Sequence, residues 1–337
     1  MLKTKAVTGV LMASALTLAF AGCKKYEEPD VINRLTTPYT LFLGTDQGII
    51  LNTNDGDNYR SYFAADGSFV RNLLIADTNL IAIKQNLYVS TNNGTSFNLK
   101  FPSAGVAASV SPNYFNIIKK SNSHKRTYLS TFGDRGIYFS EDNGLSWKPD
   151  LEWTTAVPTL TLTLAETQNG YMYTNTTTNI YLRKTAGDKW APVGKFGLPN
   201  ALSWFLTGFN NNLIAFDPSG ANGIWYSSND GGNFAQVPGS QNMTILSVQQ
   251  VDPDFALVGT DSMGVYKLKN NALISTGAGI PGNAQIFNFI SKYQTFKAGN
   301  INHHIYAITS MGLYRLDTSD QGESWVKVKN GFFTAGG

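Results

Sequence analysis

The sequence contains one cysteine, Cys23, three histidines and no long run of one charge. Because a single cysteine cannot form an intrachain disulfide, the fold must be held by core burial. Without Lys3 and Lys5 of the leader described below, the 26 basic residues fall to 24, against 23 acidic residues. This near balance gives no electrostatic reason to expect nucleic-acid binding.

Catalytic and metal-binding patterns are also absent from the sequence. The histidines, His124, His303 and His304, have no spacing typical of a zinc site. No nucleophile elbow and no phosphate-binding loop occurs. The sequence therefore predicts no metal, no cofactor and no catalytic residue.

After the leader, no stretch shows convincing helical periodicity. Short runs rich in apolar and β-branched residues alternate with Gly, Asn and Asp turns, as in an all-β protein. Several runs lead into a phrase of the form Ser-x-Asp-x-Gly-x-x-Trp, with its best copies at 140–147 and 318–325. Weaker copies occupy 52–59, 90–97, 183–190 and 227–234.

The strand that leads into this phrase repeats around the chain. Its copies begin at intervals of 38, 50, 43, 44, 41 and 48 residues, at Gly48, Asn86, Gly136, Asn179, Gly223, Gly264 and Gly312. A four-stranded propeller blade takes about 40 to 50 residues. The spacing predicts a seven-bladed β-propeller of four-stranded antiparallel blades over residues 40–337.

The residue types of the repeated phrase suit a tight turn. The Asp carboxylate can accept hydrogen bonds from backbone amides, the Gly permits a positive φ, and the Trp can cover the hairpin. A structural role is therefore expected for the residues of the two best copies: Ser140, Asp142, Gly144, Trp147, Asp320, Gly322 and Trp325.

This phrase resembles the Asp-box, or BNR, repeat of sialidases, sortilin-type receptors, some endoglucanases and photosystem II assembly factors. In those families the box is structural and usually lies far from the ligand. The resemblance to sialidases implies an arginine cluster with an Arg-Ile-Pro motif, which this chain lacks; the nearest sequence is Gly279-Ile280-Pro281. The related endoglucanases usually pair two propellers, whereas this chain has room for one. Sialidase activity is not expected.

The N-terminus has the pattern of an export leader. Lys3 and Lys5 precede an apolar run over residues 6–21, which ends in Phe20-Ala21-Gly22-Cys23. The small residues before Cys23 resemble a bacterial lipobox and imply lipidation of Cys23; an ordinary secretory leader is the alternative. Residues 1–22 would be the signal peptide and 23–39 a tether. A Lys-Tyr-Glu-Glu stretch at 25–28 loosely resembles the export tag of Bacteroidetes surface lipoproteins, which implies an outer-membrane lipoprotein facing the periplasm or the exterior.

Propellers concentrate function where loops between second and third strands meet loops between blades. Candidate binding residues in those loops are Asp46, Asp134, Arg135, Trp153, Trp204, Asp217 and Asp261. Paired carboxylates permit glycoside hydrolysis, although the same aspartates suit turn formation. The two tryptophans are expected to be exposed and to stack on a ligand.

These patterns favour a non-catalytic binding or scaffold module for a protein or glycan partner, attached to a membrane only by its lipid. A glycan-directed hydrolase using the rim carboxylates is the first alternative. An assembly factor resembling the photosystem II type is the second.

Overall fold

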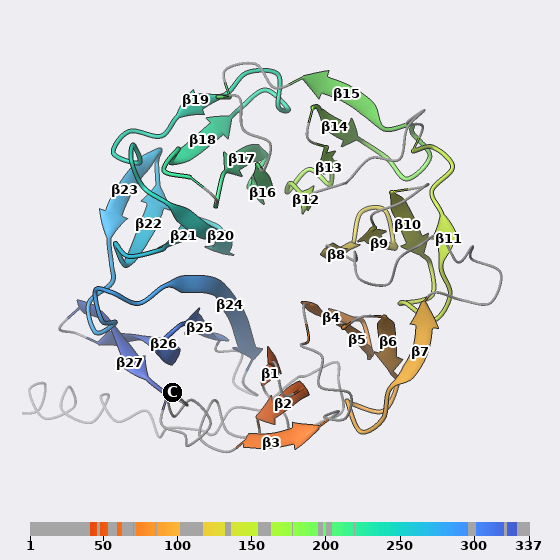
Figure 1. The fold of residues 1–337 in the computed structure, drawn as a ribbon, viewed down its shortest axis with the longest axis horizontal. Helices are drawn as coiled ribbons and strands as arrows, with labels where there is room; N and C mark the ends of the chain where they lie inside the picture. The colour runs from red at the N-terminus through yellow and green to blue at the C-terminus, as the bar shows by residue number, and fades with distance from the viewer. Residues whose placement is uncertain are drawn as a thin grey trace, which may run out of the picture. The chain divides into compact units, whose positions relative to one another are not determined.

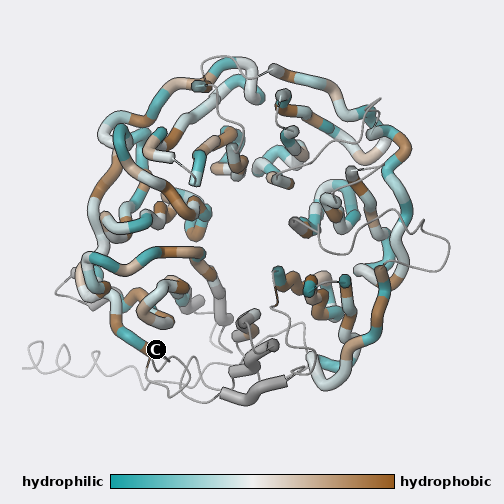
Figure 2. The backbone as a smooth tube through the Cα atoms, in the orientation of Figure 1, coloured by the Kyte–Doolittle hydropathy of each residue, from teal (hydrophilic) through white to brown (hydrophobic). Residues whose placement is uncertain are grey.

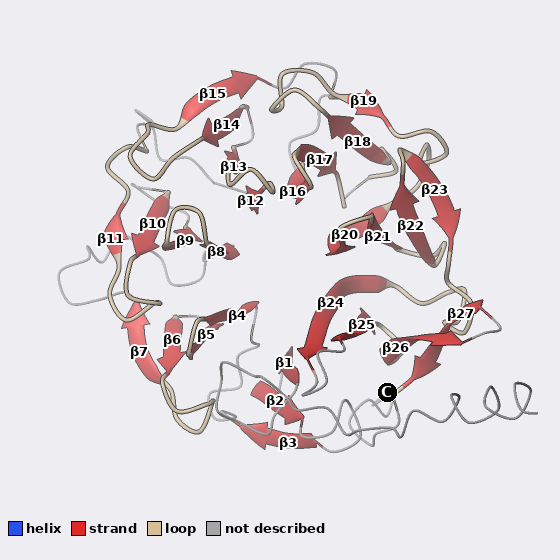
Figure 3. Cartoon of the chain, turned by 180° about the vertical axis from the view of Figure 1, so that it is seen from behind, coloured by secondary structure: helices blue, strands red, loops and turns tan. Residues whose placement is uncertain are grey.

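The computed structural model describes residues 41–45, 48–52, 59–62, 70, 72–84, 86–101, 117–131, 136–153, 163–176, 178–194, 198–199, 204–218, 220–295, 301–319 and 322–328. These residues form strands and loops without a helix (Figure 3). The chain divides into two compact units, residues 1–32 with 293–302 and residues 33–292 with 303–337. All described strands belong to the second unit apart from the ends of two, β24 and β25.

The first half of the chain contributes the strands β1 Leu41–Thr45, β2 Gly48–Asn52, β3 Tyr59–Tyr62, β4 Asn72–Ala76, β5 Asn79–Ile83, β6 Leu87–Ser90, β7 Asn98–Phe101, β8 Ile117–Ser121, β9 Arg126–Ser130, β10 Ile137–Ser140, β11 Lys148–Pro149, β12 Leu164–Glu166, β13 Met172–Asn175, β14 Ile180–Arg183 and β15 Ala191–Gly194. The second half contributes β16 Phe205–Phe209, β17 Asn212–Phe216, β18 Ile224–Ser227, β19 Ala235–Gln236, β20 Ile245–Asp252, β21 Phe255–Thr260, β22 Val265–Lys269, β23 Ala272–Ser275, β24 Ile286–Thr295, β25 Ile301–Thr309, β26 Gly312–Ser319 and β27 Gly322–Lys327.

Within the second unit, consecutive strands pair into the blades of a β-propeller (Figure 1). Six sheets have four strands each, in sequence order, from β4–β7 to β24–β27. In Figure 1 the first strand of each four-stranded sheet lies nearest the centre of the ring and the fourth lies at the periphery. The expected all-β propeller with four-stranded antiparallel blades is therefore present.

The predicted count of seven four-stranded blades is wrong, because six sheets have four strands. The remaining sheet, β1–β2–β3, has three strands among the described residues. The repeated sequence marks third strands, and it correctly locates β2, β6, β10, β14, β18, β22 and β26. In the first sheet this marker strand, β2, is second in order. A count of marker strands therefore does not count complete blades.

The hydrophobic core is divided among the junctions between successive sheets. Phe101 of β7 and Tyr138 of β10 meet edge to face across one junction, with ring centroids 4.8 Å apart. Separate buried clusters join each following pair of sheets. Figure 2 accordingly shows hydrophobic positions, in brown, in the strands of all six four-stranded sheets. Each of these five clusters therefore consists of side chains from two neighbouring sheets.

Glycine allows the closest approaches between sheets. A Cβ added at Gly208 of β16 would lie 2.0 Å from the backbone oxygen of Glu166 in β12. A Cβ at Gly259 of β21 would lie 2.6 Å from the backbone oxygen of Ile286 in β24. Because real Cβ atoms do not approach backbone this closely, both positions require glycine if the sheets keep their spacing.

The antiparallel order places two kinds of connection at opposite ends of each four-stranded sheet. Turns from first to second strands and from third to fourth strands share one end, which we name the turn end. Loops from second to third strands, and those between sheets, share the other end, which we name the rim end. The repeated phrase lies at the turn end, and the described candidate binding residues, Trp153, Trp204, Asp217 and Asp261, lie in connections at the rim end.

Candidate functional site

The best repeated turn, 140–147, is closed by its own side chains. The Ser140 hydroxyl donates to Asp142 Oδ1 over 2.7 Å and accepts the Gly144 amide over 2.8 Å. Asp142 Oδ1 also accepts the Ser146 amide over 2.9 Å. Burial alone would raise the pKa of Asp142, but the hydrogen bonds from Ser146 and Ser140 outweigh it and lower that pKa.

Two weaker sequence copies make the same bonds with Asn in place of Asp. Ser90 donates to Asn92, and Ser227 donates to Asn229, each over 2.9 Å. The Gly94 amide donates to the Ser90 hydroxyl over 2.8 Å, and the Gly231 amide donates to the Ser227 hydroxyl over 3.0 Å. Acceptor oxygens at this position, whether carboxylate or amide, therefore build one turn geometry.

The tryptophans of the two best copies are buried, Trp147 against its own turn and Trp325 against a loop of the preceding sheet. The Trp147 indole donates to the Gly144 carbonyl over 3.0 Å, and the Trp325 indole donates to the Thr276 carbonyl over 2.7 Å. Asp320 lies outside the described residues, and Gly322 begins β27. The indole hydrogen bonds of Trp147 and Trp325 agree with the structural role expected for these two residues.

The copy at 183–190 is built differently. Arg183, which replaces the serine, is only 1% exposed and forms an ion pair with Asp150, also 1% exposed, in the preceding sheet. The Trp190 indole donates to the same carboxylate over 2.9 Å. His124 lies beside this cluster, with Nδ1 2.9 Å from the Tyr128 hydroxyl and Nε2 3.2 Å from the Lys184 carbonyl. Burial lowers the pKa of His124.

The structure changes the environment expected for the two rim tryptophans. Both were expected to be exposed, but Trp153 is 6% and Trp204 is 4% exposed. Trp153 packs against Trp190 and Tyr181, and its indole N–H has no hydrogen-bond partner among the described residues. The Trp204 indole donates to the Pro199 carbonyl over 3.2 Å. Each ring fills a junction between sheets, so the expected exposure is wrong.

No contact joins the predicted rim residues that the structure describes, Trp153, Trp204, Asp217 and Asp261. Asp46, Asp134 and Arg135 lie outside the described residues, as does Cys23. Asp217 is 5% exposed and accepts the Asn222 side-chain amide over 3.1 Å. The Asp261 carboxylate accepts the Gln285 side-chain amide over 2.6 Å. Both described aspartates therefore accept hydrogen bonds from neighbouring amides.

Gln285 joins the rim loops of two neighbouring sheets. Its side chain reaches Asp261 after β21, and its backbone exchanges hydrogen bonds with Ser310 after β25, at 3.0 Å each. Three exposed apolar residues lie within two residues in the sequence of Asp261, Gln285 or Ser310. They are Met263, Phe287 and Met311, whose exposed fractions are 49%, 49% and 38%. We name these three residues the rim patch.

The rim patch was not predicted from the sequence, although a signal was present. Met263 and Met311 both stand in a Ser-Met-Gly triplet immediately before a repeated strand, at 262–264 and 310–312. Tight turns favour Gly, Asn, Asp and Ser, so the occurrence of methionine in two equivalent loops is unusual. Phe287 gave no such signal, because its exposure depends on the pairing of β24.

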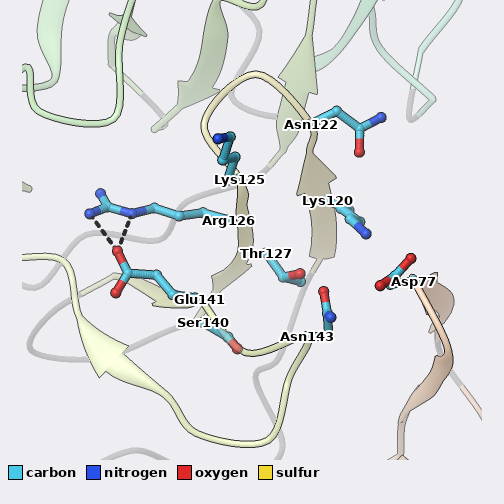
Figure 4. A pocket seen from close by; sticks show the side chains of 9 residues that line it. All are labelled: Asp77, Lys120, Asn122, Lys125, Arg126, Thr127, Ser140, Glu141 and Asn143. Atoms are coloured by element: carbon cyan, nitrogen blue, oxygen red, sulfur yellow. Dashed lines mark hydrogen bonds and ion pairs between the residues drawn. The ribbon is translucent and has the colours of Figure 1, made fainter.

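A polar cavity of about 290 Å³ lies at the turn end between the β4–β7 and β8–β11 sheets (Figure 4). Lys120, Lys125 and Arg126 line it together with Asp77 and Glu141. Arg126 donates from Nε and Nη2 to Glu141 Oε1 over 3.0 and 2.9 Å. This hydrogen bonding lowers the pKa of Glu141.

The described part of the chain contains no group of three or more His, Cys, Asp or Glu placed to hold a metal ion. The described residues include no helix that is long and apolar enough to cross a membrane.

No protein-family model matches the sequence, and no curated protein matches it significantly. Among solved structures, YCF48 bound to a D1 peptide aligns with a TM-score of 0.55 and 12% identity, over 85% of this chain and 93% of that chain. The extracellular domain of a putative hybrid two-component system from B. thetaiotaomicron aligns at 0.58 and 17%, over 87% of this chain and 35% of that one. PorZ, a surface component of the type-IX secretion system of Porphyromonas gingivalis, aligns at 0.50 and 12%, over 89% and 39%.

These proteins share the propeller fold with this chain. At such low identities the likeness concerns the fold alone. The chain spans little more than a third of the length of the two-component-system domain and of PorZ.

Proposed function

We propose that this chain is a lipid-anchored β-propeller of the cell envelope that binds a protein partner at its rim end without catalysing a reaction. The rim patch carries this proposal. Met263, Phe287 and Met311 are exposed around a network that ties two blades together. Exposed apolar residues gathered on a rigid surface are typical of protein-binding sites, and Met and Phe are enriched there.

The state of the rim carboxylates supports binding in preference to hydrolysis. Glycoside hydrolysis needs two carboxyl groups open to the substrate on either side of one bond. Asp217 is buried, and the Asp261 carboxylate is engaged with Gln285. The buried Trp153 and Trp204 also leave the glycan alternative without its expected stacking residues.

The solved structures offer support of a general kind. YCF48 is a propeller of similar length, and its structure contains a D1 peptide. PorZ is described as a bacterial surface component. Peptide binding by one protein of this fold and a surface location for another both agree with the proposal.

The anchor part of the proposal depends on the leader sequence. Residues 1–22 would be removed, and Cys23 would carry the lipid at the start of a tether ending near residue 39. Replacement of the thiol should abolish lipidation. We expect Cys23→Ser to release the protein from membranes in cell fractionation, and continued attachment would argue against the anchor.

Site-specific photo-cross-linking in the native cell tests the rim end. A photoreactive amino acid at Phe287 or at Met311 should give the same discrete protein adduct. The matched control is Leu99 in the peripheral strand β7, which is 52% exposed and lies away from the rim. Leu99 should give no such adduct. Equal adducts from all three positions, or none from Phe287 and Met311, would contradict the proposal, and a glycosidase-sensitive adduct would indicate a glycan partner.

A further inference from the structure

We propose that the cavity in Figure 4 is a second binding site, which receives the carboxylates of an acidic peptide segment. It lies at the turn end, whereas the rim patch lies at the opposite end of the blades. The choice of a peptide over other anions rests on the proposed function. The presence of an anion site rests on the cavity alone.

The lining of the cavity is rich in hydrogen-bond donors and in positive charge. Lys120 and Lys125 have no ion-pair partner among the described residues, and each ammonium has three donors. The side-chain amides of Asn122 and Asn143 also line the space. Figure 4 shows Lys120 and Asn122 on one strand end and its following turn, with Lys125 on the same turn. Such a lining complements an anion.

Neighbouring contacts fix the wall of the cavity before any ligand arrives. Arg126 is held by Glu141, donates to the Ala186 carbonyl over 2.8 Å and lies over the Phe139 ring at 4.1 Å from its centroid. Across the junction, the Asn79 side chain donates to the Asn143 carbonyl over 3.1 Å. Arg126 and Glu141 therefore satisfy each other, and Lys120 and Lys125 supply the charge for a ligand.

The cavity volume of about 290 Å³ leaves room for the acidic side chains of a peptide segment. Asp77 also lines the cavity, and its carboxylate lowers the net positive charge that a ligand meets. The site should consequently be weak, dependent on salt and selective for repeated acidic residues.

Binding of fluorescein-labelled hexaglutamate to the full chain, followed by fluorescence anisotropy at low salt, tests the inference. Lys120→Gln/Lys125→Gln should weaken binding by about tenfold, as expected for two exposed ion pairs. The matched control, Lys189→Gln/Lys327→Gln, removes the same charge from exposed positions outside the cavity and should change affinity by less than about twofold. Asp77→Asn should strengthen binding.

Each of three outcomes would overturn the inference: hexaglutamate binds no better than hexaglutamine, the two double variants weaken binding equally, or inorganic phosphate binds as tightly as the peptide. The rim variant Phe287→Ser/Met311→Ser should leave hexaglutamate affinity unchanged. Loss of rim cross-linking with intact hexaglutamate binding would therefore contradict the proposed function alone, and the reverse result would contradict this inference alone.

Discussion

The turns at 140–147 and 183–190 occupy the same place in consecutive blades but stabilise different parts of the protein. Ser140 bonds within its own hairpin, through Asp142 and the Gly144 amide. Arg183 donates to the Thr185 and Ala186 carbonyls of its own turn and also reaches back to Asp150 of the preceding blade. One position of the repeat can therefore close a turn alone, or close a turn and also fasten two blades together. The difference depends on whether its side chain is short or long.

The largest effect should come from breaking the contact between blades. Asp150→Ala leaves the buried Arg183 guanidinium uncompensated and removes the acceptor of the Trp190 indole. We expect the free energy of unfolding to fall by about 3–5 kcal/mol, measured by urea denaturation. The double variant Asp150→Leu/Arg183→Met removes both charges and should recover much of the loss. A cost of under about 1 kcal/mol for Asp150→Ala would show that the pair does not fasten the blades.

A smaller change in stability is expected when the glycine at the fifth position of each turn, Gly144 or Gly187, is replaced by alanine. Gly144 has a φ of +91°, and a Cβ there would lie 2.6 Å from Ile81 Cδ1. Gly187 has open space within 4 Å and no positive φ. Gly144→Ala should cost about 1–3 kcal/mol, whereas Gly187→Ala should be neutral or stabilise by up to about 1 kcal/mol. Thermal unfolding of both variants measures this, and equal costs would mean that the two turns share one backbone.

The smallest effect should be a difference in pH dependence. Burial lowers the pKa of His124, which contacts the 183–190 turn, so the unfolded chain binds a proton first as pH falls below about 6.5. The lowered pKa of Asp142 makes its contribution complete above about pH 3.8 and lost as pH falls through the lower folded value.

Between pH 8 and pH 5, His124→Gln should therefore lose less stability than the wild type. Asp142→Asn should keep the wild-type slope over that range, since Asn makes the same bonds at residues 92 and 229. Denaturant titrations at several pH values measure the slopes. Parallel slopes for the wild type and His124→Gln would show that His124 does not titrate between the two states.

Local patterns in the sequence predicted more of the fold than of the site. The Gly-apolar strand and its polar turn lie within about a dozen residues, so the third strands could be located. Trp153 and Trp204 carry no sign of their burial, because the side chains that cover them come from strands in neighbouring repeats. Asp150 resembles an ordinary loop acid, and its partner Arg183 lies 33 residues away. The repeated Ser-Met-Gly triplet could have indicated the rim patch, but its link through Gln285 depends on the arrangement of the blades.

The cores shared between sheets determine how the chain should open. Phe101 and Tyr138 belong to different repeats yet pack in the same buried cluster, so neither sheet can unfold without exposing side chains of its neighbour. Backbone amides of β5 and β9 should consequently exchange with deuterium as one group. The unit that repeats in the sequence is one sheet, whereas the unit that opens and closes is a pair.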